Sequence, residues 1–175
     1  MNVVKEIKKN LRDVVDFPKK GIVFKDITPI LKIPKLCTAI INELSTLLDK
    51  DVTHVVGVES RGFLFGFLLA NKMEIPFVPI RKVGKLPGET LQYKYDLEYG
   101  SAEVEIHKND VQKGWNILIH DDLLATGGTA SAAAELVLRL GCKVSAFTFV
   151  VNLDFLNGKK EIKEYTNNII SLIEY

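Results

Sequence analysis

Apolar runs alternate with segments of helical periodicity along this chain, which is typical of an α/β protein with a parallel sheet. Short apolar runs predict strands at residues 52–58, 76–80, 115–120, 144–151 and 169–173. Apolar residues at helical spacing predict helices at residues 2–12, 34–49, 61–73 and 129–140, the last stopping at Gly141. We therefore expect residues 1–175 to form a single α/β domain with helices flanking a central, mostly parallel sheet.

Residues 82–110 interrupt this alternation. The segment contains Gly84, Pro87, Gly88 and Gly100, with polar and aromatic residues between them. A long stretch of weak periodicity inside a domain is usually either a functional loop or a disordered insert. Because the strands on both sides are well formed, we favour a flexible catalytic lid that can contain a β-hairpin.

The composition is that of an ordinary globular domain. Of the 175 residues, 47% are hydrophobic and 26% are charged, and the net charge is +1. This balance gives no support for a nucleic-acid or membrane surface held by bulk charge. The chain has no apolar run of about 18 residues, and residues 1–12 are too charged for a signal peptide. We expect a cytoplasmic protein in which Cys37 and Cys142 are reduced and buried.

The most informative segment covers residues 117–129. A buried strand is followed by two carboxylates, Asp121 and Asp122, and then by a glycine-rich turn that opens a helix. At the carboxyl end of a parallel strand, the backbone N–H groups of residues 126–129 and the helix N-terminus suit a phosphate. Two acids would repel that phosphate, so we expect them to serve ribose hydroxyls or water on a bound magnesium ion.

This segment resembles the motif with which type I phosphoribosyltransferases bind phosphoribosyl pyrophosphate (PRPP). By chance, such a match should arise in roughly one chain of this length in 10⁵. His120 departs from the motif, because the family usually has an apolar residue there. The resemblance implies the type I phosphoribosyltransferase fold, with a small N-terminal hood in residues 1–33 and the lid in residues 82–110. The matching positions are Asp121, Asp122, Thr126, Gly127, Gly128 and Thr129.

Two further segments suit a pyrophosphate leaving group. Residues 59–63 follow an apolar strand and open a helix, and backbone N–H groups there, together with Arg61, would suit pyrophosphate. Residues 81–88 place Arg81, Lys82 and Lys85 beside a turn, where cations can neutralise a leaving group. A salt-bridged surface arginine and a solvated basic loop are the plain alternatives for these two segments.

The N-terminal tract narrows the resemblance. Residues 17–29 contain two prolines and by themselves indicate a loop. Lys25, within this tract, stands where some members of the family carry arginine. The segments that together resemble the adenine phosphoribosyltransferase family, in the same order and with similar spacing, are residues 17–29, 59–63, 85–88, 97–100, 121–129 and 156–159.

The resemblance implies a base site in the hood. Phe24 and Leu123 would sandwich the purine, and backbone groups of Val23 and Lys25 would read the adenine edge. A 6-oxo base reverses both polarities at that edge, so it would be rejected. Glu98, a partly desolvated carboxylate of the lid, would contact N7 of the purine and handle its proton.

The resemblance also implies the complete set of site residues and a non-proline cis peptide between Glu59 and Ser60. The catalytic candidates are Glu98, Arg61, Lys85, Asp121 and Asp122. The substrate-binding candidates are Val23, Phe24, Lys25, Glu59, Ser60, Arg61, Arg81, Lys82, Lys85, Tyr99, Asp121, Asp122, Leu123, Ala125, Thr126, Gly127, Gly128 and Thr129.

The implied activity is transfer of the phosphoribosyl group of PRPP to N9 of adenine, giving AMP, by a homodimer. Magnesium (Mg²⁺) would be held mainly by PRPP, without direct protein ligands, although water could link it to Asp121 or Asp122. We expect no nucleic-acid or membrane partner. Two alternatives stay open: a phosphoribosyltransferase for guanine, xanthine or orotate, and a PRPP-sensing transcriptional regulator. The regulator would need a nucleic-acid-binding surface, which the charge does not indicate.

Overall fold

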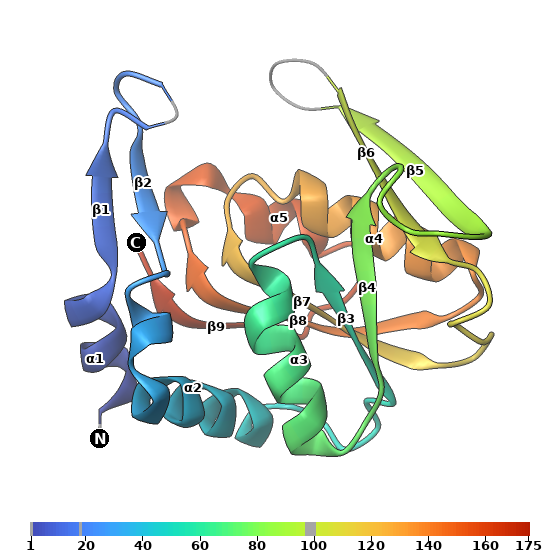
Figure 1. Ribbon diagram of the computed structural model, residues 1–175, viewed down its shortest axis with the longest axis horizontal. Helices are drawn as coiled ribbons and strands as arrows, with labels where there is room; N and C mark the ends of the chain where they lie inside the picture. Colours follow the sequence, from blue (N-terminus) through green and yellow to red (C-terminus); the bar gives the residue numbers. More distant parts are fainter. Residues whose placement is uncertain (1, 18, 97–100) are drawn as a thin grey trace.

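A seven-stranded sheet forms the centre of the computed structural model, which describes residues 2–17, 19–96 and 101–175 (Figure 1). The strand order is β5-β6-β4-β3-β7-β8-β9, and neighbours from β4 to β9 pair in parallel. The predicted mostly parallel sheet is therefore confirmed. The parallel strands are β3 (His54–Val58), β4 (Phe77–Lys82), β7 (Asn116–Leu124), β8 (Lys143–Asn152) and β9 (Ile169–Glu174).

Helices cover both faces of this sheet (Figure 1). One face carries α1 (Val3–Asn10), α2 (Pro34–Thr46) and α3 (Gly62–Met73), and the other carries α4 (Gly128–Arg139) and α5 (Gly158–Ile162). Successive side chains of a strand point to opposite faces. Val55 of β3 accordingly packs with α2 and α3, whereas Val56 and Val58 pack with α4. The strands are apolar on both faces because both faces are covered.

The hairpin expected inside residues 82–110 is present. β5 (Thr90–Asp96) and β6 (Ser101–His107) pair antiparallel, and β6 also pairs antiparallel with the end of β4. The hairpin therefore extends the central sheet, and in Figure 1 it rises beyond the carboxyl end of β4. Glu98 and Tyr99 lie outside the described residues.

Residues 17–29, which the sequence indicated as a loop, contain a strand. β1 (Arg12–Val15) and β2 (Val23–Asp26) form a separate two-stranded antiparallel sheet. Each strand has only 4 residues, too few for alternation to reveal. Charged side chains support the pairing across the two strands, because Lys25 Nζ lies 2.7 Å from Asp13 Oδ1. The 3-10 turn Ile30–Lys32 then leads into α2.

Other boundaries and elements also differ from the prediction. α2 ends at Thr46 rather than at residue 49. β7 continues beyond His120 to Leu124, because Asp121 and Leu123 pair with Phe149 and Val151 of β8. The 3-10 turn Asp154–Leu156 and the short helix α5 were not predicted. The extension of β7 matters for function, since it places both acids on a strand of the sheet.

Two histidines are packed in the core. His54 stacks on Trp115 with ring centroids 3.4 Å apart, as its position in an apolar strand indicates. His120 is fully buried, and its Nδ1 lies 2.9 Å from Oγ1 of Thr148. Burial lowers the pKa of His120 to about 3, so its ring is neutral at pH 7.

Both cysteines are free thiols, but only Cys142 is buried; Cys37 is half-buried, so that part of the prediction was wrong. Within the described ranges, no helix is both long enough and apolar enough to span a membrane.

Candidate active site

A cavity of about 390 Å³ lies where the loops after β3 and β7 meet the β1–β2 hairpin. Its volume is in the range of small-molecule sites. Adjacent parallel strands end at the same edge of the sheet, which brings these loops together. The lining residues are Ile22, Val23, Phe24, Lys25, Glu59, Ser60, Arg61, Asp121, Asp122, Leu123, Ala125, Thr129, Leu153 and Leu156.

The loop between β7 and α4 lines an adjoining pocket with residues 125–129. Gly127 has a φ of +93°, a left-handed conformation that favours glycine, and α4 begins at the next residue. The first N–H groups of a helix have no acceptor within the helix, and they carry partial positive charge. This pocket therefore suits an anion such as a phosphate.

Close packing against α5 shapes the same loop. A Cβ added to Gly158, the first residue of α5, would lie 2.2 Å from the carbonyl oxygen of Ala125. A Cβ added to Gly127 would lie 2.9 Å from the carbonyl oxygen of Gly158. The turn at residues 156–159 entered the sequence analysis only through the resemblance, whereas the structure shows that its backbone packs on the backbone of the loop at residues 125–129.

Asp121 and Asp122 lie side by side at the end of β7 and both line the cavity. Oδ1 of Asp121 accepts a hydrogen bond from the backbone N–H of Asp122 at 2.8 Å. Burial, together with repulsion from Asp122, raises the pKa of Asp121 well above its usual range. Burial also raises the pKa of Asp122, although Arg61 opposes that shift. Adjacent acids with perturbed pKa values are typical of functional sites.

Arg61 connects the acids with the hood. Its Nε lies 2.9 Å from Oδ2 of Asp122, and its guanidinium carbon lies 4.8 Å from the centroid of the Phe24 ring. The first contact offsets part of the negative charge, and the second is at cation–π distance. Arg61 also lines the cavity, so its ion pair belongs to the site rather than to a remote surface.

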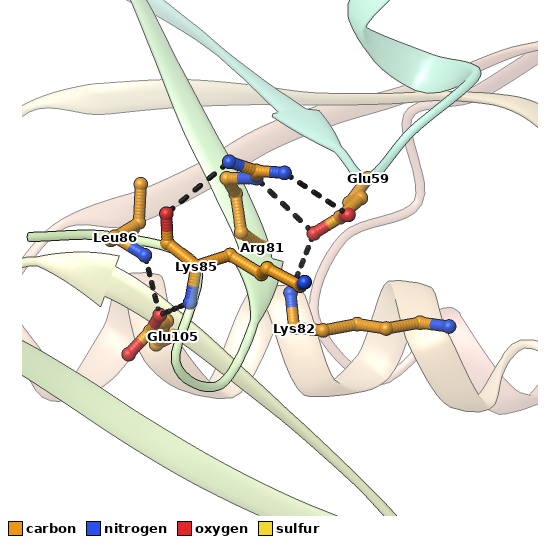
Figure 2. Close-up of polar contacts among 6 residues, drawn as sticks. All are labelled: Glu59, Arg81, Lys82, Lys85, Leu86 and Glu105. Atoms are coloured by element: carbon orange, nitrogen blue, oxygen red, sulfur yellow. Dashed lines mark hydrogen bonds and ion pairs between the residues drawn. The ribbon is translucent and has the colours of Figure 1, made fainter.

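Glu59 organises the basic residues at the end of β4 (Figure 2). The peptide bond between Glu59 and Ser60 is cis, as the resemblance implied. The Glu59 carboxylate accepts hydrogen bonds from Nε and Nη2 of Arg81, both at 3.3 Å, and from the backbone N–H of Lys82 at 2.8 Å. Burial favours a raised pKa for Glu59, but these hydrogen bonds outweigh it and lower the pKa. Glu59 is therefore ionised at neutral pH and orients Arg81.

The β1–β2 hairpin brings Phe24 and backbone groups to the cavity. The ammonium of Lys25 is engaged elsewhere: its Nζ lies beside Asp13 and 4.1 Å from the ring centroid of Tyr175. Residues two apart on a strand direct their backbone groups to the same edge, so Val23 and Lys25 share one edge of β2. Within the residues that the structure describes, β2 has a strand neighbour only on its β1 side.

The structure brings most of the candidate residues together. Of the residues that the structure describes, fourteen line the main cavity and eleven of these are candidates, while the expected Thr126, Gly127 and Gly128 line the adjoining pocket. Among the described candidates, Arg81, Lys82 and Lys85 line neither the cavity nor the pocket. Arg81 and the backbone of Lys82 nevertheless donate hydrogen bonds to Glu59, which lines the main cavity. The sequence analysis missed three apolar lining residues, for which loops carry no periodic signal: Ile22, Leu153 and Leu156.

The acid pair also bears on a metal. In the described part of the chain, no group of three or more His, Cys, Asp or Glu side chains is arranged to hold an ion. Asp121 and Asp122 do present carboxylate oxygens to the cavity, and oxygen is the ligand that Mg²⁺ prefers. These residues fit an ion that enters on a phosphorylated ligand and keeps part of its water shell.

Comparison with known protein sequences agrees with this site. Residues 24–174 match the family described as phosphoribosyl transferase domain. An adenine phosphoribosyltransferase from Methanococcus vannielii is 48% identical over 171 residues, which cover 97% of this chain and 98% of the relative. One from Cytophaga hutchinsonii is 47% identical over 170 residues, covering 97% and 94%.

Solved structures give the same result. The adenine phosphoribosyltransferase from Thermoanaerobacter pseudethanolicus superposes with a TM-score of 0.94 at 49% identity, covering 98% of this chain and 99% of that one. The enzyme from Saccharomyces cerevisiae, solved with an imino-altritol bisphosphate and adenine, gives a TM-score of 0.91 at 40% identity, covering 98% of both chains.

Proposed function

The chain belongs to the phosphoribosyl transferase domain family, and from this premise we propose that it transfers the phosphoribosyl group of PRPP to N9 of adenine, giving AMP and pyrophosphate. One observation carries the proposal. A single cavity joins Phe24 and the backbone of β2 to the acid pair, and it adjoins the phosphate loop at residues 125–129. A purine, a ribose and a phosphate can therefore be held in one line.

Adenine occupies the hood end of the cavity. Phe24 and Leu123 pack on the two faces of the purine, and both line the cavity. Backbone groups of Val23 and Lys25 pair with N1 and the 6-amino group, and both residues line the cavity, which supports this assignment. A 6-oxo base would leave these buried polar groups mispaired, at a cost of several kcal/mol.

PRPP occupies the strand end. Its 5′-phosphate accepts hydrogen bonds from the N–H groups of residues 126–129, while the hydroxyls of its ribose donate to Asp121 and Asp122. The bond between C1′ and the pyrophosphate oxygen breaks with its electron pair on that oxygen, and the carboxylates stabilise the positive charge on the ribose ring.

A new bond then forms between N9 of adenine and C1′. In the N7–H tautomer of adenine, the lone pair of N9 attacks, and Glu98 accepts the proton from N7. Closure of residues 82–110 would exclude water, which otherwise competes with adenine for C1′.

Cations stabilise the departing pyrophosphate. We assign this role to Arg61, Arg81, Lys82 and Lys85. Bound Mg²⁺ would neutralise part of the pyrophosphate charge, with Asp121 or Asp122 holding its water ligands. Arg61 and Arg81 are paired with Asp122 and Glu59, two residues that line the cavity, and this supports the assignment.

A homodimer in the cytoplasm is the form that we propose. The support lies on α3, where Leu64, Phe67 and Leu68 are 42%, 56% and 44% exposed and form an apolar face. Sedimentation of wild-type protein and of Phe67→Lys tests this. A dimer that Phe67→Lys converts to a folded monomer supports α3 as the interface, and a monomeric wild type refutes it.

A panel of bases tests the activity. The protein is incubated with PRPP and magnesium and with adenine, hypoxanthine, guanine, xanthine or orotate, and both nucleotide and pyrophosphate are measured. AMP from adenine alone is the expected result. Turnover of a 6-oxo base would overturn the assignment of Val23 and Lys25. PRPP binding without turnover of any base would favour a PRPP-sensing regulator.

A further inference from the structure

Glu105 is a buried carboxylate that lines neither the main cavity nor the adjoining pocket. It lies on β6 and is only 2% exposed. A charged side chain is seldom buried to this extent unless its neighbours compensate the lost hydration. The groups that compensate it belong to the segment that carries Lys85 and to β5.

Hydrogen bonds satisfy both oxygens of this carboxylate. Oε1 accepts from the backbone N–H of Lys85 at 2.9 Å and from that of Leu86 at 2.8 Å. Oε2 accepts from Thr90 Oγ1 at 3.0 Å and from Gln92 Nε2 at 3.5 Å. Burial favours a raised pKa for Glu105, but these donors, led by the two backbone groups, lower it overall. Two successive N–H groups on one oxygen form the type of concave site that binds anions.

The same peptide segment is held from its other side. Nη1 of Arg81 donates to the carbonyl oxygen of Lys85 at 3.2 Å, while Nε and Nη2 of Arg81 donate to Glu59. The backbone of Lys85 is thus fixed through its N–H by Glu105 and through its C=O by Arg81. Figure 2 shows the Lys85 side chain leading from this fixed backbone towards Glu59 and Lys82.

We propose that Glu105 is a positioning residue, which acts through the backbone of Lys85 to hold the Lys85 ammonium where it can meet the pyrophosphate of PRPP. This inference rests on the proposed function. Lysine has a flexible four-carbon side chain, so the place that its ammonium can reach depends on where its backbone is anchored. A loop that is anchored in advance spends less of the binding energy of PRPP on ordering.

The carboxylate also sets the path of the chain between β4 and the β5–β6 hairpin. Lys85 and Leu86 follow β4, Thr90 and Gln92 lie on β5, and Glu105 lies on β6. One buried group therefore connects the turn to both strands of the hairpin. Removal of that group leaves two N–H donors without their acceptor, so the turn should move while the strands stay paired.

A double-mutant cycle tests the inference. Glu105→Ala is measured in the wild type and in a Lys85→Ala background, with kcat and KM determined for PRPP and for adenine. Glu105→Gln is the conservative variant, because its amide oxygen can still accept from both N–H groups. Glu103→Ala is the matched control, since Glu103 lies on the same strand and is exposed. Urea unfolding of every variant checks that it is folded.

If Glu105 acts through Lys85, Glu105→Ala lowers kcat/KM for PRPP by about tenfold to a hundredfold in the wild type, and by less than about threefold when Lys85 is absent. The KM of Glu105→Ala for adenine stays close to that of the wild type, as do the kinetic constants of the Glu103→Ala control. Glu105→Gln retains more activity than Glu105→Ala.

Equal losses in both Lys85 backgrounds would overturn the inference, as would a fully active Glu105→Ala. If Glu105→Ala does not fold, the cycle with Glu105→Gln decides by the same comparison. A wild type that uses no base would instead refute the proposed function, so the two failures can be told apart.

Discussion

Substitution of Gly158 by alanine is a severe test of how the phosphate loop is held. The new Cβ would lie 2.2 Å from the carbonyl oxygen of Ala125, whereas real Cβ atoms essentially never come within 3.0 Å of a neighbouring heavy atom. The loop and α5 must therefore separate by at least about 0.8 Å. The shortest contact is with the backbone carbonyl oxygen of Ala125, so a change of side-chain rotamer cannot relieve the overlap.

Two opposing terms set the magnitude. Overpacking of this kind costs about 1–3 kcal/mol, while alanine gains at most about 1 kcal/mol over glycine in a helix and less at its first residue. We expect Gly158→Ala to lower the free energy of unfolding by about 1–2 kcal/mol, a fall in Tm of roughly 2–8 °C for a chain of this size. A shift near 1 Å in the phosphate loop should also lower kcat/KM for PRPP by up to about a hundredfold.

Urea unfolding and steady-state kinetics measure the two effects. Gly128→Ala is the control for stability. Gly128 lies on the phosphate loop itself, but a Cβ added there would meet nothing closer than a ring carbon of Tyr95 at 3.8 Å. That variant should be as stable as the wild type or more stable. If Gly158→Ala unfolds at the wild-type urea concentration and has a normal kcat/KM for PRPP, the proposed coupling between α5 and the phosphate loop is wrong.

Three other predictions concern charge. Burial and Asp122 raise the pKa of Asp121, so the ionised form of Asp121 destabilises the fold at pH 8. Asp121→Asn should therefore raise the Tm at pH 8 by a few degrees, while kcat falls about a hundredfold. An unchanged or lower Tm would contradict this. His120 has its pKa lowered to about 3 by burial, below the unfolded value of about 6.5, so the unfolded state gains the proton as pH falls. Between pH 7.5 and 5.5 the wild type should lose about 1.4 kcal/mol more stability than His120→Val, and parallel pH profiles from urea unfolding would refute that. Glu98→Gln should lower kcat by about 10²-fold to 10⁴-fold, and a near-normal rate would remove Glu98 from the mechanism.

Strands, helices and short motifs can be predicted from the sequence where their signal lies in contiguous residues. Burial of apolar side chains imposes a pattern on the sequence, and this pattern alone predicted several elements. Among them are the strands β3, β4, β7, β8 and β9 and the helices α2, α3 and α4. The Asp121–Thr129 segment indicated a phosphate loop for the same reason, since its glycines, acids and helix start are adjacent in the chain. Each of these signals arises within about a dozen residues.

The rest depended on contacts between distant residues, for which a single sequence has no local signal. β1 and β2 are too short to show alternation and are stabilised only by pairing with one another. The role of Gly158 depends on its distance to Ala125, and that of Glu105 on the return of β6 to the turn that contains Lys85. The sequence by itself determined the apolar strands of the parallel sheet, the helices α1 to α4 and the segment to which we assign phosphate binding. Only the tertiary structure decided which buried groups hold the loops of the site, because it brings strands and turns from separate parts of the chain within bonding distance.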